Sequence, residues 1–167
     1  MRTCLYQVAV LLVLLSACRK KAGEEELPAP APGKCNIAAR LSGTVYTLFT
    51  TIPDESSTLL GGEIFLYAEG VKPSPFAPAA YFEIILPLTI SPGTYNQAAA
   101  TASGIIVVFY DAVGNQWING GAPAAGFVLT VSRRTATEVV GTFSGPLYSF
   151  PLGSSVTISN GRFYGRF

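Results

Sequence analysis

Alternation of apolar and polar residues at every second position is the feature of this 167-residue sequence that most limits how it can fold. From Cys35 to the end of the chain, no segment repeats apolar residues at helical spacing over three turns. Short alternating runs are instead separated by Gly and Pro, of which the sequence has 17 and 12. A half-buried strand has this period of two because its successive side chains point to opposite faces. The pattern therefore predicts an all-β domain.

We expect about nine strands, joined by turns into an antiparallel β-sandwich or a flattened barrel. The segments with the clearest alternation are 40–51, 63–69, 81–88, 104–110, 116–119, 127–133, 138–147 and the region from about 155 onward. Segment 104–110 is apolar on both faces, which suits a central strand, and it should form a hairpin with 116–119. A second hairpin should join 127–133 to 138–147.

Near the C-terminus, Asn160-Gly161 leaves two arrangements open. Asn-Gly favours a two-residue type I′ hairpin turn, but Gly also marks β-bulges, where one strand carries an extra residue. The runs on either side are too short to decide between them. We favour the bulge, which predicts one long terminal strand.

The first 17 residues have the features of a helical signal peptide. Arg2 gives a positive start, and the apolar run at 5–15 has about 11 residues, whereas a helix that crosses a bilayer needs about 20. The run ends in LSAC at 15–18, which resembles the lipobox of bacterial lipoproteins. That resemblance implies cleavage before Cys18 and lipid attachment to it. An ordinary secretory leader with a small-residue cleavage site is the alternative.

Residues 18–34 form the expected link between this lipid and the domain. Alternating Pro and Ala at 28–32 favours an extended polyproline II conformation. Such a tether is semi-rigid and reaches at most roughly 50 Å, at about 3.1 Å per residue. The expected organisation is a signal peptide at 1–17, a lipidated tether at 18–34 and an all-β domain at 35–167.

The balance of charge argues against one class of partner. From Lys34 onward, seven basic residues are matched by seven acidic residues. A protein that binds nucleic acid presents a net basic field to the phosphate backbone. We therefore expect no nucleic-acid binding.

The sequence lacks the residues of the commonest catalytic and metal sites. It contains no histidine, which removes the Ser-His-Asp triad, the Cys-His pair and the usual zinc ligand. Its acidic residues show no calcium-loop spacing. The carboxylates that remain as candidates for glycoside hydrolysis are Glu63, Glu69, Glu83, Asp111 and Glu138. Because solvated carboxylates are common on strand surfaces, we expect no enzyme activity, no metal and no cofactor.

Cys35, at the start of the domain, leaves two alternatives open. Cys4 belongs to the leader and Cys18 to the lipid site, so no disulfide can form within the domain. Cys35 is either a buried small hydrophobic residue or a thiol available for pairing between chains. The tendency of cysteine to be buried favours the first.

The strongest candidate for a ligand contact is Trp117, the only tryptophan. Asn115, Gln116 and Asn119 place three side-chain amides beside it, near an expected hairpin end. An indole among amides is suited to stacking on a sugar ring and hydrogen bonding its hydroxyls. The alternative is that Trp117 packs into the core and the amides shape the turn.

Four motifs carry a resemblance to a group of envelope proteins. They are ISPGTY at 90–95, GFVLTV at 126–131, VGTFSG at 140–145 and VTISNGRF at 156–163. In order and spacing they resemble small Bacteroidota lipoprotein domains of unknown function, which carry PGTY-like, GTFSG-like and terminal TNGxF-like segments. The resemblance covers residues 90–167. It implies a β-rich fold and an envelope location, without an active site.

These features predict a non-catalytic lipoprotein of the outer membrane, on its periplasmic side or at the cell surface, with a binding or structural role. Its lipid would contact the membrane, and its other partner would be a glycan or an envelope protein. A surface glycan-binding module is the alternative. The terminal aromatics Phe163, Tyr164 and Phe167 also resemble the end of a transmembrane β-barrel, but the lipobox and the strand apolar on both faces argue against it.

Overall fold

The computed structural model describes residues 27–42, 49–50, 58–70, 79–120 and 125–167. The predicted signal peptide, Cys18 and most of the tether lie outside these residues, and so does most of the expected strand at 40–51.

The described residues form eleven β-strands and one short helix. In chain order these are β1 (Cys35–Leu41), β2 (Phe49–Thr50), β3 (Thr58–Leu60), β4 (Glu63–Glu69), β5 (Tyr81–Pro87), β6 (Gly93–Asn96), α2 (Gln97–Ala102), β7 (Ile106–Tyr110), β8 (Gln116–Ile118), β9 (Val128–Arg134), β10 (Glu138–Ser149) and β11 (Ser154–Arg166). The predicted all-β class is confirmed, and so are both predicted hairpins, β7–β8 and β9–β10. The strands outnumber the expected nine partly because β3 and β6 have only three and four residues, too few to show alternation. The residues of β2 lie within the expected strand at 40–51.

The first strand begins earlier than predicted. β1 runs from Cys35 to Leu41 and overlaps the predicted strand at 40–51 only at Arg40 and Leu41, while β2 lies near the other end of that segment and residues 43–48 are outside the described part. The inward residues of β1 include Ala39, which has low β-propensity and gives a weak hydrophobic signal. Burial of Cys35 and Ile37 in the core nevertheless fixes the alternation of this segment.

The strand pairings are antiparallel and form a ring. Around the ring the order is β11, β1, β2, β4, β5, β7, β8 and β10, and β10 pairs again with β11. Within the described residues, the strand pairing of β8 with β10 consists of one residue pair, Ile118 with Tyr148. β9 and β6 extend the sheet from β10. The result is a nearly closed flattened barrel, one of the two predicted architectures.

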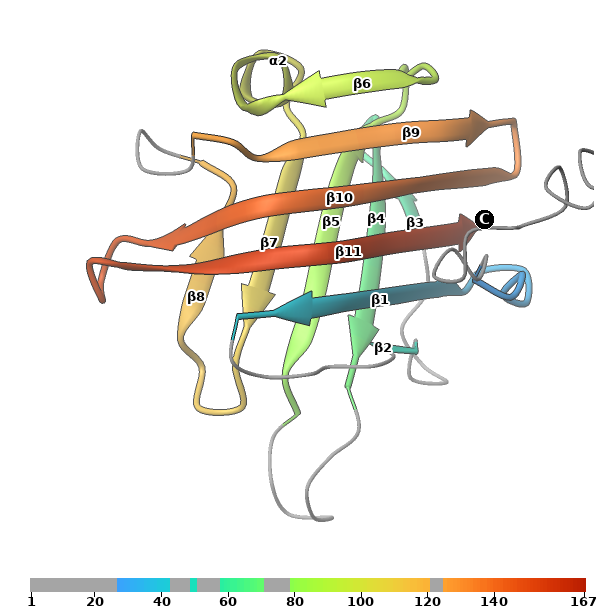
Figure 1. The fold of residues 1–167 in the computed structure, drawn as a ribbon. Coiled ribbons are helices and arrows are strands. Elements are labelled where there is room, and N and C mark those ends of the chain that lie inside the picture. The colour runs from blue at the N-terminus through green and yellow to red at the C-terminus, as the bar shows by residue number, and fades with distance from the viewer. Residues whose placement is uncertain (1–26, 43–48, 51–57, 71–78, 121–124) are drawn as a thin grey trace, which may run out of the picture.

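Figure 1 shows this barrel as two layers whose strands cross one another. We call β1, β6, β9, β10 and β11 the front layer, and β3, β4, β5, β7 and β8 the rear layer. In the rear layer, the inward rows of β4 and β5 are fully buried: Ile64, Leu66, Ala68, Phe82, Ile84 and Leu86. Burial of each large side chain in these rows stabilises the fold by about 1.5 to 3 kcal/mol.

In the front layer, two phenylalanines pack against glycines on the opposite strand. Phe143 of β10 is paired with Gly161 of β11, and Gly141 of β10 with Phe163 of β11. A Cβ atom on Gly161 would lie 2.8 Å from Cγ of Phe143, and one on Gly141 would lie 2.7 Å from Cε1 of Phe163. Both rings are buried in the core. Each ring therefore occupies space that a side chain opposite it would need.

β11 runs unbroken through Asn160-Gly161, so the preferred β-bulge is confirmed. Asn160 has a φ of 53°, and the pairing of β11 shifts register at this point against both neighbours. Asn tolerates this left-handed conformation better than most residues. The bulge therefore lies in the middle of the front layer.

The described part of the tether, residues 27–34, packs against the start of β1 and the end of β11. The side-chain amide of Asn36 donates to the carbonyl oxygen of Pro28 (2.8 Å), and Nη1 of Arg166 donates to that of Pro30 (3.2 Å). Pro30 is itself buried. The chain thus joins the domain before the predicted boundary at Cys35.

The domain has one six-residue helix, α2, in its described part, in line with the prediction of almost no helix. The side chain of Asn96 caps it by accepting a hydrogen bond from the backbone N–H of Ala99 (3.0 Å). Among the described residues, no helix has the length and apolar character needed to cross a membrane.

Candidate functional site

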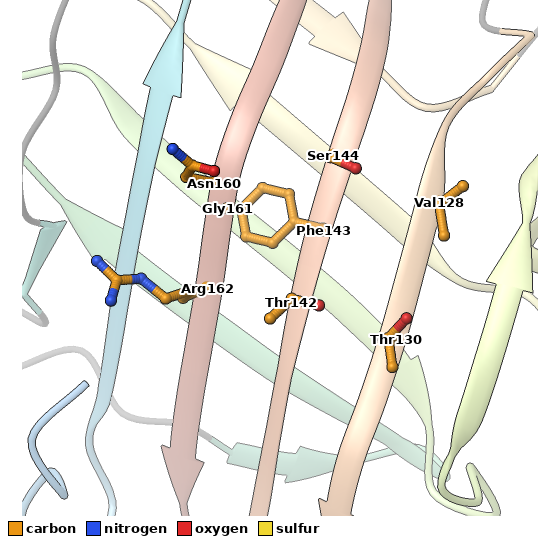
Figure 2. Close-up of a pocket in the computed structure, with 8 residues that line it drawn as sticks. All are labelled: Val128, Thr130, Thr142, Phe143, Ser144, Asn160, Gly161 and Arg162. Carbon is orange, nitrogen blue, oxygen red and sulfur yellow. The ribbon is translucent and has the colours of Figure 1, made fainter. Parts of the chain in front are cut away.

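An open pocket of about 270 Å³ lies on the outer face of the front layer, over β9, β10 and β11 (Figure 2). Its outward side chains come in pairs from the three strands: Val128 and Thr130, Thr142 and Ser144, and Asn160 and Arg162. Phe143 and Gly161, which alternate with these outward residues, complete its lining. The pocket is therefore built by strand pairing and not by a loop.

The hollow exists because the middle strand carries small side chains. Thr142 and Ser144 of β10 are shorter than the side chains of Arg162 and Asn160 on β11. Gly161 adds no side chain between these two. Since Phe143 is buried, its ring packs on the core side and does not project from the outer face.

The two sides of the pocket differ in chemistry. On β11, Arg162 supplies a guanidinium and Asn160 an amide, and Figure 2 shows both side chains leaning toward β1. On β9, Val128 is apolar, and the hydroxyl of Thr130 is 3.1 Å from that of Thr94 on β6. A ligand in the hollow would meet the hydroxyls of Thr142 and Ser144 on the middle strand and the apolar side chain of Val128 on β9.

The bulge contributes to the shape of this site. An extra residue in β11 opposite Ser144 changes which side chains share a face on either side of it. At the bulge the successive residues Ser159 and Asn160 are both exposed, and the alternation then resumes with Gly161 buried and Arg162 on the outer face. The bulge therefore sets which residues of β11 precede Arg162 on the outer face, and one of them, Asn160, lines the pocket.

Trp117, the predicted ligand contact, lies elsewhere. It is on β8, 8% exposed, with its ring centroid 5.7 Å from that of Phe109 and within the core cluster. Its buried Nε1 atom has no hydrogen-bond partner among the described residues, and neither has Oγ of Ser149 on β10. The exposed indole that sugar stacking requires is not present, and these contacts favour the packing alternative.

The three amides predicted beside Trp117 do not converge on one surface. Asn119 is 2% exposed, and its side-chain amide is hydrogen-bonded to the backbone at β7. Its Oδ1 accepts from the N–H of Val107 (2.9 Å), and its Nδ2 donates to the carbonyl oxygen of Ile105 (3.1 Å). Asn115 donates to the Asp111 carboxylate (2.8 Å) within the β7–β8 turn. Gln116 is exposed and donates to the hydroxyl of Tyr110 (2.9 Å). Each amide has a structural partner.

None of the candidate carboxylates lines the pocket. Asp111 accepts hydrogen bonds from the backbone of its own turn. Glu138 accepts from Nε of Arg133 (2.9 Å) and from the hydroxyl of Tyr164 (2.7 Å). Burial raises the pKa of Glu83 on the outer face of the rear layer.

Cys35 is fully buried, and its thiol donates to the carbonyl oxygen of Tyr67 (3.0 Å). This placement agrees with the first of the two sequence alternatives, a small hydrophobic residue in the core. In the described part of the chain, no group of three His, Cys, Asp or Glu residues could hold a metal ion.

The sequence analysis did not identify the pocket residues. Thr and Ser at alternate strand positions have the pattern of any solvated face. The available signal was the Asn160-Gly161 pair, since a bulge often re-aims side chains at a functional surface.

Comparison with known protein families, with curated proteins and with solved structures finds no match to this chain. The resemblance to Bacteroidota lipoproteins therefore remains a prediction from the sequence motifs.

Proposed function

We propose that this chain is a non-catalytic envelope lipoprotein, anchored by lipid on Cys18, whose β-domain binds a ligand in the pocket of the front layer. The pocket carries this proposal, because it gathers polar side chains of three strands at an open hollow. The short apolar leader and the LSAC sequence support the lipid anchor. The resemblance of the sequence motifs to Bacteroidota envelope lipoproteins supports an outer-membrane location.

Within this proposal, the lining favours a hydroxyl-rich ligand, which is the glycan-binding alternative. Thr142, Ser144 and Asn160 provide both donors and acceptors, as a sugar ring does. Val128 offers an apolar contact for the C–H groups of such a ring. These side chains differ from the aromatic platform expected around Trp117, but they suit the same class of ligand, a glycan.

The non-catalytic part of the proposal rests on the placement of reactive groups. Glycoside hydrolysis needs two carboxylates separated by roughly 5 to 9.5 Å across a bound sugar. The pocket lining contains no carboxylate, and the sequence contains no histidine. Binding alone is the activity that these side chains support.

A glycan array probed with the intact lipoprotein in detergent tests the binding proposal. Thr142→Tyr fills the hollow from the middle strand and should abolish binding of any glycan identified. Thr157→Tyr is the matched control, since Thr157 is also exposed on β11 but does not line the pocket. Equal binding by wild type and Thr142→Tyr would place the ligand elsewhere.

Mass spectrometry of the mature N-terminus tests the anchor. We expect a diacylated or triacylated Cys18 in the wild-type protein and no acylated, membrane-held product from Cys18→Ala. An acylated Cys18→Ala product would refute the lipoprotein assignment.

A further inference from the structure

The turn that joins β10 to β11 exposes two large apolar side chains. Phe150 is 65% exposed and Leu152 is 49% exposed, and Pro151 between them is exposed as well. The ring of Tyr148 packs edge-on against that of Phe150, with the ring centroids 5.1 Å apart. Figure 1 shows this turn at the left end of the front layer, beyond β8. We call residues 150–152 the hairpin tip.

The absence of charge distinguishes the hairpin tip from the other exposed apolar residues of the described chain. Residues 139–161, which include the tip and most of the two strands behind it, contain no Lys, Arg, Asp or Glu. The other exposed large apolar residues each have a charged residue beside them, through a hydrogen bond or a strand pairing: Leu60 with Glu63, Leu88 with Arg134, and Val113 with Asp111. The β10–β11 hairpin is thus apolar at its end and uncharged along most of its length.

The small size of the hairpin tip favours a lipid surface over a folded protein as its partner. A specific protein interface buries about 800 Å² on each side and involves roughly 20 to 30 residues of each partner. Three residues at the end of a hairpin are too few for such an interface, whereas a lipid surface requires no complementary shape. Phe and Leu side chains gain free energy when they leave water for the boundary between headgroups and acyl chains. An uncharged tip avoids the cost of bringing a charge there.

We propose that the hairpin tip inserts into the surface of the membrane that carries the lipid anchor, as a second and shallow contact of the chain with that membrane. This inference rests on the lipid anchor of the proposed function. The anchor holds the tip close to the bilayer, so the effective concentration of lipid at the tip is high. A contact that would be weak by itself is therefore sufficient.

The two membrane contacts lie at opposite ends of the front layer. The tether joins the domain where Cys35 of β1 is paired with Gly165, near the end of β11, whereas the tip directly precedes the start of β11 at Ser154. The 13 residues of β11 span roughly 40 Å at about 3.3 Å per residue. Residues 18–27 reach at most roughly 30 Å. The front layer therefore cannot stand upright on its tip, and insertion inclines it toward the bilayer.

Tryptophan fluorescence of the full lipoprotein, reconstituted in phosphatidylcholine vesicles, tests this inference. Trp117 is the only tryptophan of the chain and is buried in the core, so it contributes a constant background. Phe150→Trp adds a second indole at the hairpin tip. We expect the emission of this added indole to be lost in vesicles of phosphatidylcholine with brominated acyl chains, which quench only indoles that reach them.

A matched control uses the turn between β7 and β8, where Val113 is 82% exposed. Val113→Trp adds the same indole to another exposed turn and should keep its emission in the brominated vesicles. In ordinary vesicles, the emission of Phe150→Trp should lie at shorter wavelength than that of Val113→Trp, because its indole has left water.

A charge at the hairpin tip should prevent insertion. Leu152→Asp, combined with Phe150→Trp, should restore the emission in brominated vesicles, because a carboxylate at the tip opposes its transfer out of water. Val113→Asp in the same Phe150→Trp protein introduces the same charge away from the tip and should leave the quenching unchanged.

Flotation of the same vesicles separates failure of this inference from failure of the proposed anchor. A protein that floats with the vesicles while Phe150→Trp stays unquenched would keep the anchor and overturn the inference, leaving a protein partner or a second copy as the occupant of the tip. Equal quenching of Phe150→Trp and Val113→Trp would show contact without a preferred site and would overturn it too. A protein that neither floats nor is quenched in excess vesicles would refute both.

Discussion

The outer faces of the front and rear layers differ although both come from strands with the same alternation. On the front layer, outward Thr, Ser, Asn and Arg side chains surround an open pocket. On the rear layer, Tyr67, Tyr81 and Tyr110 form a row across β4, β5 and β7, with ring centroids 4.9 and 4.3 Å apart. The front face can exchange hydrogen bonds with a ligand, whereas the tyrosine rings contact one another.

The inner faces of the two layers differ in how they reach close packing. The rear layer fills its side of the core with large side chains that are paired across adjacent strands, such as Leu66 with Ile84 and Phe82 with Phe109. The front layer pairs large rings with glycines, as Phe143 with Gly161. Small residues of the front layer therefore have two effects. Gly141 and Gly161 make room for the phenylalanine rings on the inner face, and Thr142 and Ser144 leave a hollow on the outer face.

The largest expected effect is in the rear layer, at Trp117. Trp117→Ala should lower the free energy of unfolding by about 3 to 5 kcal/mol, because it leaves a cavity beside Phe109. Trp117→Phe should cost less, since it keeps a ring and removes a buried indole N–H that has no hydrogen-bond partner in the described part of the chain. Urea denaturation of the three proteins measures both. A loss below about 1 kcal/mol for Trp117→Ala would contradict the buried placement.

The corresponding test in the front layer is Gly141→Ala. The new methyl group would overlap the ring of Phe163 and the carbonyl oxygen of Thr130. Overpacking of this kind should cost about 3 kcal/mol and lower the melting temperature accordingly. Gly120→Ala is the control, because its Cβ would meet nothing within 4 Å. Similar melting temperatures for the two variants would show that the front layer can relax around Gly141.

The sequence predicted the fold class and both hairpins because alternation and turn residues act locally. The inward residues Ile64, Leu66 and Ala68 of β4 lie on the face that the pattern predicted. Closure of the ring through Ile118 and Tyr148 joins residues distant in the chain, and no local pattern records such a pairing.

The candidate site was predicted less well, for two physical reasons. Trp117 and Asn119 are adjacent to turn residues, but the strand alternation of β8 turns both inward. The pocket depends on register, which aligns Thr130, Thr142 and Arg162 across three strands. Register follows from the bulge and the turns together, so residue types alone did not reveal it.

A smaller effect should follow from changing the bulge residue of the front layer. Asn160→Ala places an ordinary residue at a φ of 53° and should cost about 1 kcal/mol, while Asn160→Gly should be close to neutral. Chemical denaturation, fitted with one m-value for all the proteins, would resolve this difference in the free energy of unfolding. Equal stabilities for the Ala and Gly variants would mean that the left-handed conformation is not required.

The smallest effect concerns Glu83 of the rear layer, whose pKa is raised by burial. Between its unfolded and folded pKa values, the folded state binds more protons, so stability falls as pH rises through this range. Glu83→Gln should therefore raise the melting temperature slightly at pH 7, and the gain should shrink as pH falls from the folded pKa to the unfolded pKa.

The same variant has a second readout at Tyr110. Its pKa is raised by burial and, to a lesser extent, by the charge of Glu83. Glu83→Gln should therefore lower the pKa of Tyr110, which ultraviolet titration of the tyrosines can follow. An unchanged titration together with a pH-independent melting difference would contradict the assigned environment of Glu83.

Because Pro28 and Pro30 pack against β1 and β11, the domain can reach a smaller volume around its lipid anchor. With the lipid on Cys18, as proposed, the segment that separates the lipid from the first contact with the domain is 18–27 and not 18–34. Its maximum span is roughly 30 Å instead of 50 Å, and the swept volume, which scales with the cube of that span, falls to about a fifth. Since effective concentration rises as accessible volume falls, the docked linker confines the pocket near the membrane, favouring encounters with molecules held there over those in bulk solution.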